Sequence, residues 1–244
     1  FCRRRLFQFV RHGTGVISLS KARRRSSAGS IWLVAGVGVL FVGGLIGLSL
    51  WSTNRQAANA PIYLPEIKTD AELGADGMAV GSPDAPVELV EWSDFYCPGC
   101  GQVHRILEPE FMPLIEAGEM RFVVKDFVLD GHRPWSQWAA EAAHCAADQG
   151  MFWAYRTTLF HNQKQWTKND LKRYAAELGL DTAAFNQCLD SEKHKEAVDA
   201  STAEAHSLAL RGTPTFFANG EEISIEEYRT VDAFMARIQE EIDR

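Results

Sequence analysis

Residues 87–100 read VELVEWSDFYCPGC, and this stretch decides the fold that we expect for the chain. Its first six residues are mostly apolar, β-branched or aromatic, which predicts a buried strand. The sequence from Cys97 to Cys100 follows closely, and Pro98 suits the first turn of a helix, where a missing N–H costs little. The stretch therefore predicts a strand that leads into a helix with two cysteines at its N-terminus.

The sequence after the cysteines predicts a crossover to a second strand. A helix should run from the cysteine pair toward residue 117, and Pro109 and Pro113 should kink or end it. Residues 121–128, RFVVKDFV, have the composition of another buried strand. Strand, helix and strand in this order form a βαβ unit, whose strands are parallel. The cysteines then lie where the first strand passes into the helix.

A long helical block follows this unit. Between about residues 131 and 211 the apolar residues recur with helical spacing, and no segment is a convincing strand. The helices expected there cover residues 135–149, 151–161, 168–178, 183–189 and 192–210. The simplest architecture is an α/β domain that is split by an all-helical insertion.

The sheet should resume after the helical block. Residues 215–218 and 222–225 read as antiparallel strands around the turn Asn219-Gly220. An amphipathic helix is expected over residues 227–242. These elements complete the α/β part of the predicted domain.

A lone Cys-x-x-Cys is chemically ambiguous, because two thiolates at this spacing can bind zinc, be structural or exchange disulfides. Structural zinc needs four ligands, and the sequence has no second Cys-x-x-Cys. Covalent haem attachment needs a His at the place of Gly101. A helix N-terminus stabilises an anion, so the pKa of Cys97 should fall. The pattern favours redox exchange by Cys97 with Cys100 as its buried partner, and it predicts no metal site.

The same stretch, together with GTPTFF at residues 212–217, resembles the DsbA-like branch of the thioredoxin superfamily over roughly residues 78–244. The resemblance implies a thioredoxin-like fold in which Thr213 and a cis Pro214 lie against the cysteine turn and bind the substrate backbone. Pro98 and Gly99 would belong to the same substrate-binding surface. The DsbA type proper has a His at the place of Gly99, so the oxidising strength of the pair stays open.

Glu91 stands six residues before Cys97, where thioredoxin-like proteins have a buried acid. The implied role of this carboxylate is a proton relay to or from Cys100. Because Glu91 lies in an apolar strand, we expect burial to raise its pKa. The alternative is a solvated strand face.

Cys145 and Cys188 lie in the expected insertion, 43 positions apart. Some DsbA-like relatives have a second, structural disulfide in the helical part, and two thiols in an oxidising compartment tend to pair if they are within reach. We expect this pair to form a structural disulfide. Two buried free thiols are the alternative.

The first 51 residues hold eight of the 25 basic residues of the chain and none of its 32 acidic residues. Residues 31–51 are uncharged, and a helix of that length spans the hydrocarbon layer of about 30 Å. We expect an uncleaved transmembrane anchor rather than a signal peptide. By the positive-inside rule, residues 1–30 form a basic cytosolic segment. Residues 52–77 should be a linker that leads to a catalytic domain at 78–244 on the periplasmic side of the cytoplasmic (inner) membrane.

The expected function is a thiol:disulfide oxidoreductase, most simply an oxidase that introduces disulfides into exported cysteine-containing proteins. The resemblance implies reoxidation by a DsbB- or VKOR-type membrane partner, and the reaction needs no cofactor beyond the redox-active disulfide. The same residues also suit an isomerase or reductase, and a redox-inactive chaperone or binding module is the alternative of another class. Beyond residue 51 the chain is acidic, which argues against nucleic acid as a partner. The basic segment suits a lipid bilayer.

Overall fold

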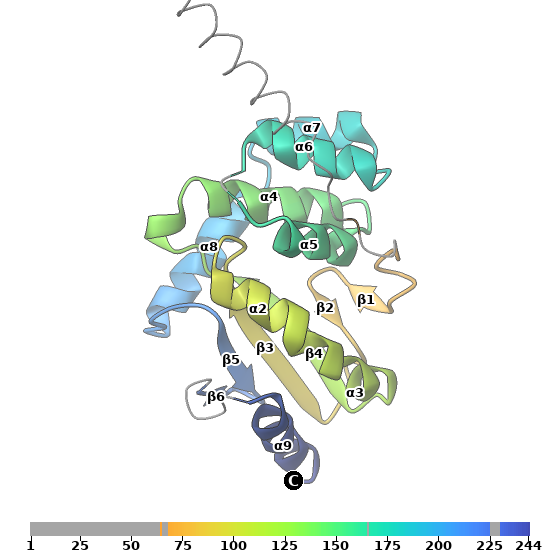
Figure 1. The fold of residues 1–244 in the computed structure, drawn as a ribbon, viewed down its shortest axis with the longest axis vertical. Coiled ribbons are helices and arrows are strands. Elements are labelled where there is room, and N and C mark those ends of the chain that lie inside the picture. The colour runs from red at the N-terminus through yellow and green to blue at the C-terminus, as the bar shows by residue number, and fades with distance from the viewer. Residues whose placement is uncertain (1–63, 65–67, 165, 225–229) are drawn as a thin grey trace, which may run out of the picture. The chain divides into compact units, whose positions relative to one another are not determined.

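The computed structural model describes residues 64, 68–164, 166–224 and 230–244. These residues form a mixed sheet at the centre of the unit Ala60–Arg244, with helices around it (Figure 1). The strand order is β1-β2-β4-β3-β5-β6. The strands are β1 (Ala75–Asp76), β2 (Ala79–Val80), β3 (Val87–Ser93), β4 (Met120–Asp126), β5 (Thr215–Ala218) and β6 (Glu221–Ile223).

The two long central strands, β3 and β4, are parallel, and their register runs from Val87 opposite Met120 to Ser93 opposite Asp126. This pairing confirms the predicted βαβ unit. The connection between them breaks at the two prolines, as expected, into α2 (Pro98–Ile106), η1 (Glu108–Glu110) and α3 (Met112–Glu116). Each proline lies in a first turn, where the absent N–H has no intrahelical partner to lose.

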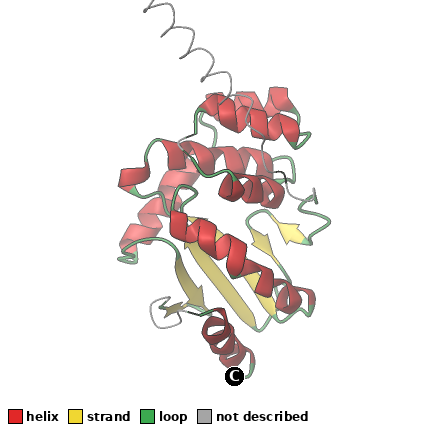
Figure 2. Cartoon of the chain, in the orientation of Figure 1, coloured by secondary structure: helices red, strands yellow, loops and turns green. Residues whose placement is uncertain are grey.

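The described residues between β4 and β5 are helical, which confirms the expected insertion (Figure 2). Its elements are η2 (Asp130–His132), α4 (Trp135–Ala147), α5 (Phe152–His161), α6 (Lys168–Glu177), α7 (Thr182–Asp190) and α8 (Lys195–Ser207). The last of these is shorter than the predicted helix over residues 192–210. Glu192 and Ala209 have φ angles of 54° and 57°, which a right-handed helix does not contain.

Helices cover both faces of the sheet. On one face, Phe216 of β5 lies cross-strand from Glu91 and packs on Phe234 of α9 (Val231–Ile242), with ring centroids 5.1 Å apart. On the other face, Trp92 of β3 packs in a small apolar cluster with Ala205 of α8. Because β3 is covered from both sides at this point, the carboxylate of Glu91 is removed from water.

The prediction that residues 52–77 are a linker is wrong for residues 68–77. Asp70 is buried, and its carboxylate accepts hydrogen bonds from the backbone N–H groups of Phe152 (2.9 Å) and Trp153 (3.1 Å), the first residues of α5. The short strand β1 pairs with β2, which in turn pairs with β4. A single capping residue and two-residue strands leave no periodic pattern in a sequence.

The predicted segments 1–30, 31–51 and 52–63 lie outside the described residues. Among the residues that the structure describes, no helix is long and apolar enough to cross a membrane.

Cys145 of α4 and Cys188 of α7 form a disulfide, with Cα atoms 5.9 Å apart. The pairing therefore replaces the alternative of two free thiols. The bond closes a loop with a sequence separation of 43 and ties two helices of the insertion together.

Removing this disulfide should lower the stability of the protein. Closing a loop of this length is worth about 4 kcal/mol in the chain-entropy description, so we expect a Cys145→Ala/Cys188→Ala variant to lose about that much free energy of unfolding. Urea unfolding of oxidised wild type and variant measures the difference. A loss below about 1 kcal/mol would show that the bond stabilises little beyond the packing around it.

Candidate active site

The two cysteines of the Cys-Pro-Gly-Cys turn occupy different environments at the start of α2. Cys97 is the residue before the helix, with extended backbone angles, and Pro98 is the first helical residue. Cys97 is 8% exposed, whereas Cys100 is 0% exposed. The two thiols are free in the structure. Cys100 lies one turn deeper, as predicted, and the role of Cys97 in meeting partners stays a prediction.

Groups at the start of α2 and in the Pro214 loop lower the pKa of Cys97. The thiol of Cys100 is the largest cause that lowers the pKa of Cys97 to about 5, against the opposing effect of burial. The Thr213 side chain and the backbone N–H groups of Cys100 and Gly99 lower this pKa further. The sulfur of Cys97 is therefore a thiolate at neutral pH, which is the form that attacks disulfides.

Cys100 is held as a neutral thiol. Burial raises its pKa well above 9, and the hydrogen bond to Cys97 and the charge of Glu91 raise it further. The backbone N–H of Asp94 points to the Cys100 sulfur at 3.5 Å. The difference in environment separates the roles of the two sulfurs: one ionises easily, and the other has to be deprotonated by a base before it can attack.

The loop that contains Pro214 lies against the cysteine turn. The Thr213–Pro214 peptide bond is cis, as predicted. The Thr213 carbonyl oxygen is 3.2 Å from the Cys97 sulfur, and a Cβ atom at Gly99 would lie 3.2 Å from Pro214 Cδ. The structure thus brings together the predicted substrate-binding residues Pro98, Gly99 and Thr213 with Cys97 and Pro214. Their role in binding a substrate chain stays a prediction.

Glu91 is 0% exposed in β3. Burial raises its pKa to about 8, although the charge of Arg156 acts in the opposite direction. Its carboxylate accepts hydrogen bonds from Ser93 Oγ at 3.0 Å and from Arg156 Nη2 at 2.9 Å. The expectation of a buried acid with a raised pKa is confirmed, and the solvated alternative is wrong.

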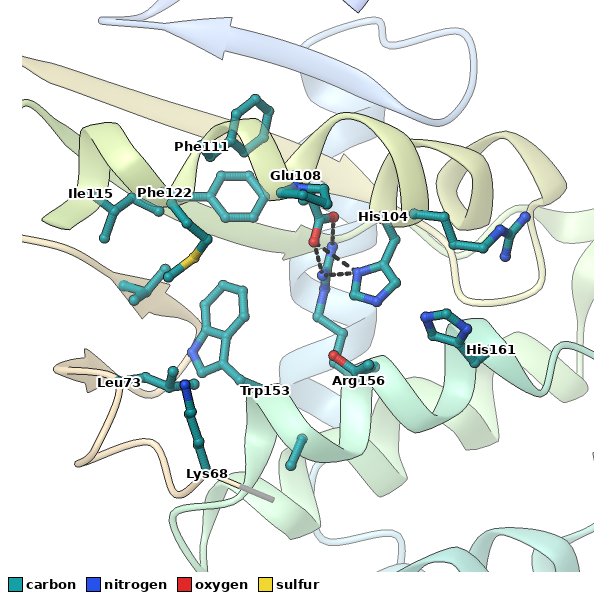
Figure 3. Close-up of a pocket in the computed structure, with 16 residues that line it drawn as sticks. Lys68, Leu73, His104, Glu108, Phe111, Ile115, Phe122, Trp153, Arg156 and His161 are labelled. Atoms are coloured by element: carbon teal, nitrogen blue, oxygen red, sulfur yellow. Dashed lines mark hydrogen bonds and ion pairs between the residues drawn. The ribbon is translucent and has the colours of Figure 1, made fainter. Parts of the chain in front are cut away.

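The sequence analysis did not identify Arg156. This residue of α5 is 1% exposed and reaches from the insertion to the thioredoxin-like part, where it pairs with Glu91 and Glu108. Figure 3 shows its guanidinium between α5 and the α2–η1 segment, beside Glu108 and His104. A charged residue in the apolar segment MFWAYRTTLF was the available signal.

Two further contacts from the insertion brace the cysteine turn. The Gln163 side-chain amide donates to the carbonyl oxygens of Phe95 and Cys97, each at 2.9 Å. A Cβ atom at position 101 would lie 2.3 Å from Gln163 Oε1, so Gly101 leaves room for this amide. The buried carboxylate of Asp94 accepts from the Ser136 hydroxyl at 2.6 Å and fixes the loop before the cysteines.

Among the described residues, one group of metal-ligating type comes together, formed by Cys145, Cys188 and His194. The two sulfurs of this group are joined in the disulfide and are not free thiolates.

A Cys-x-x-Cys turn that faces a cis-proline beside parallel strands places the chain in the class of thioredoxin-fold proteins. The Thioredoxin family model (Thioredoxin_4) matches residues 74–240, and the chain belongs to this family. Among solved structures, BdbD from Bacillus subtilis in its oxidised form is similar, with 23% identity and a TM-score of 0.63 over 75% of this chain and 98% of that one. Wolbachia pipientis α-DsbA1 has 23% identity and a TM-score of 0.58 over 74% and 94% of the two chains. At this identity the likeness shows a common fold.

One relative found by its sequence is named as an ion antiporter. The Na(+)/H(+) antiporter NhaA 3 of Salinispora tropica is 35% identical over 201 residues, which cover 76% of this chain and 30% of the antiporter. The chain thus spans about a third of the length of this relative. Antiport is the named activity of that longer protein.

Proposed function

We propose that the chain is a protein thiol:disulfide oxidoreductase that works as an oxidase through Cys97 and Cys100. The observation that carries the proposal is the geometry of the pair: Cys97 lies at the N-terminus of α2, 3.2 Å from the Thr213 carbonyl oxygen of the Pro214 loop, and Cys100 is fully buried behind it. This geometry lowers the pKa of Cys97 and raises that of Cys100. Stabilising the thiolate favours the reduced pair, so the disulfide becomes a stronger oxidant. A Cys97 pKa of about 5 favours the reduced state at pH 7 by about 2.7 kcal/mol, or roughly 60 mV, relative to an unperturbed pair.

The exchange takes place in two steps. A substrate thiolate attacks the Cys97 sulfur of the oxidised pair; the new disulfide forms as the bond to Cys100 breaks, and Cys100 leaves as a thiolate that takes up a proton. A second substrate thiolate then attacks the substrate sulfur, and Cys97 leaves as the stable thiolate. Two electrons pass from the substrate to the protein, and the substrate gains a disulfide.

The proposed substrates are exported proteins with reduced cysteines. In this proposal residues 31–51 anchor the chain in the cytoplasmic membrane, and the active site faces the periplasm. A membrane reoxidant of the DsbB or VKOR type would take the two electrons from the reduced pair. A groove of about 620 Å³ beside the Pro214 loop, lined by Gly212, Thr213 and Thr215 among others, offers room for an extended substrate chain.

The redox equilibrium of the full chain with glutathione tests the proposal. We expect a potential above about −180 mV at pH 7, more oxidising than thioredoxin at about −270 mV. Since Cys97 stays ionised above pH 5, reducing the pair takes up one proton, whereas making two glutathione thiols takes up two. The equilibrium constant for reduction of the protein by glutathione should therefore rise about tenfold per pH unit between pH 5 and 8.

Two other results would change the proposed function. A potential near that of thioredoxin would indicate a reductase. A pair that does not titrate with glutathione would leave a binding module on the thioredoxin fold.

A further inference from the structure

Arg156 stands between two carboxylates in the interior. Its Nη2 atom is 2.9 Å from Glu91 Oε2 and 2.6 Å from Glu108 Oε1, and its Nη1 atom is 2.7 Å from Glu108 Oε2. One buried cation balances one buried carboxylate, so the second carboxyl group in this cluster is most stable with a proton. Glu91 contacts one guanidinium nitrogen, whereas Glu108 contacts two, and Glu91 is the less exposed of the two carboxyl groups. The proton therefore belongs on Glu91.

His104 completes the cluster on the side away from Glu91. Its Nδ1 atom lies 2.8 Å from Glu108 Oε2, an acceptor, and 3.0 Å from Arg156 Nη1, a donor. A protonated Nδ1 can donate to Glu108, and an unprotonated Nδ1 can accept from Arg156. The gain or loss of one proton on this nitrogen thus changes which neighbour His104 binds.

Solvent reaches this cluster through a cavity of about 590 Å³ between the insertion and the α2–α3 side of the sheet. The side chains of His104, Glu108 and Arg156 form part of its wall, opposite Lys68 and Leu73 (Figure 3). Cys97, Cys100 and Pro214 are not among the described residues that line it. The cavity and the substrate-facing turn are therefore separate openings toward the same buried centre.

The redox reaction requires a proton path of this kind. When the reduced pair is reoxidised, the oxidant first forms a mixed disulfide with Cys97, and Cys100 must lose its thiol proton before its sulfur can attack that disulfide. Cys100 and Glu91 are each 0% exposed, so a proton that Glu91 takes from Cys100 has no direct exit to water. The ion pair of Glu91 is with Arg156, which also binds Glu108 at the cavity wall.

We propose that this cavity is the proton port of the redox centre, in which Glu108 and His104 exchange the proton of Glu91 with solvent and Arg156 holds the carboxylates in place. The proposal rests on the proposed disulfide exchange and names three positioning residues that act on Cys100 only through Glu91. In each reoxidation, Glu91 first releases its own proton through the cavity and then takes the proton of Cys100, while the Cys100 sulfur attacks Cys97 and the thiolate of the oxidant departs.

The charged and titratable groups around the port come from each element that packs against it. They are Glu91 of β3, His104 and Arg105 of α2, Glu108 of η1, Arg156 and His161 of α5, and Lys68 before β1. Of these, His104 is an imidazole that contacts both Glu108 and Arg156, which makes it the residue to change.

The test is chemical rescue in a His104→Ala variant of the full chain. The reduced protein is mixed with glutathione disulfide, and resolution of the mixed disulfide on Cys97 is followed by rapid quenching and mass analysis from pH 5.5 to 8.5. We expect resolution to slow by about tenfold or more at pH 7, and imidazole added at the same pH to restore it in proportion to the imidazole base concentration. The redox potential should not change, because no contact of the Cys97 thiolate is removed.

A Lys68→Met variant is the matched control, since it changes the far wall of the same cavity. We expect its rate to equal that of wild type and to be insensitive to imidazole. Normal resolution in His104→Ala, or slow resolution that imidazole does not change, would overturn the port. If His104→Ala does not fold, His104→Gln takes its place: a slower rate with an unchanged potential supports the port, and an unchanged pH profile overturns it. Failure of the exchange in wild type itself would instead reject the proposed function.

Discussion

A Cys97→Ser variant should lose disulfide exchange, with a fall in rate on the order of 10⁴-fold or more, because the sulfur that forms the covalent intermediate is gone. Cys97 is the more exposed member of the pair, at 8% against 0%, and the fully buried Cys100 cannot meet a protein thiol in its place. The measurement is the oxidation of a dithiol peptide, with glutathione disulfide as the final oxidant and the remaining peptide thiols as the readout.

The Cys100→Ser variant is the matched control, because it keeps the attacking sulfur. With glutathione disulfide and no peptide it should form a mixed disulfide between Cys97 and glutathione that cannot be resolved by Cys100, so that this covalent complex accumulates and is seen by mass analysis. Turnover by Cys100→Ser at the wild-type rate, or activity in Cys97→Ser, would contradict the assigned roles.

Much of the fold could be predicted because its elements have strong local patterns. Apolar periodicity predicts the strand before Cys97 and the helices of the insertion. Pro109 and Pro113 predict where the first helix breaks. The cis Pro214 could be expected only from the resemblance of the motifs, since local sequence does not fix the isomer of an X-Pro bond. The cis Arg133–Pro134 bond had no such motif and was not expected.

The contacts that the sequence analysis missed join residues far apart in the chain. Arg156 is 65 positions from Glu91, and Gln163 is 66 positions from Cys97. Periodicity describes one element at a time and does not say which buried charge faces which. One of these contacts could have been predicted from the sequence. Glu91 and Arg156 are opposite charges in two apolar segments, and because each needs a buried partner, they are expected to pair.

These contacts give the helical insertion a part in the chemistry. Gln163 fixes the backbone of the cysteine turn, and Arg156 controls the charge around the acid below it. The pKa of Cys97 is lowered by Cys100, by Thr213 and by backbone N–H groups at the α2 N-terminus, whereas Arg156 of the insertion acts on Cys100 through its ion pair with Glu91. A change in how the insertion packs should therefore act on Cys100 through Glu91.

A Glu91→Gln variant should show the next largest effect on rate. Without a base beside it, Cys100 must lose its proton to a distant group, and we expect resolution of the mixed disulfide to slow by about 10²-fold at pH 7. In wild type this rate should rise as Glu91 loses its proton near pH 8, and the rise should disappear in the variant. Formation of the mixed disulfide by Cys97 is the internal control, because it does not require deprotonation of Cys100.

The same substitution should stabilise the fold at alkaline pH. The folded pKa of Glu91 is raised from 4.5 to about 8, so the folded state holds a proton that the unfolded chain has lost between these values. The contribution of Glu91 to the free energy of unfolding is fully present below pH 4.5 and falls by about 1.4 kcal/mol per pH unit up to pH 8. Glutamine has no proton to lose, and Glu91→Gln should therefore be more stable than wild type at pH 8 by roughly 3–5 kcal/mol in urea unfolding.

Glu108→Gln should change stability in the opposite direction. Burial would raise the pKa of Glu108, but the charges of Arg156 and His104 and their hydrogen bonds outweigh it and lower the pKa to about 2. Its contribution is present above pH 4.5 and is lost as the pH falls toward 2, so this variant should lose roughly 3 kcal/mol at pH 7. Opposite changes in stability for the two variants would show that Arg156 pairs with one ionised and one protonated carboxyl group. A loss of stability in both variants at pH 8 would mean that both carboxylates are ionised, and Glu91 could not then hold the proton that the exchange requires.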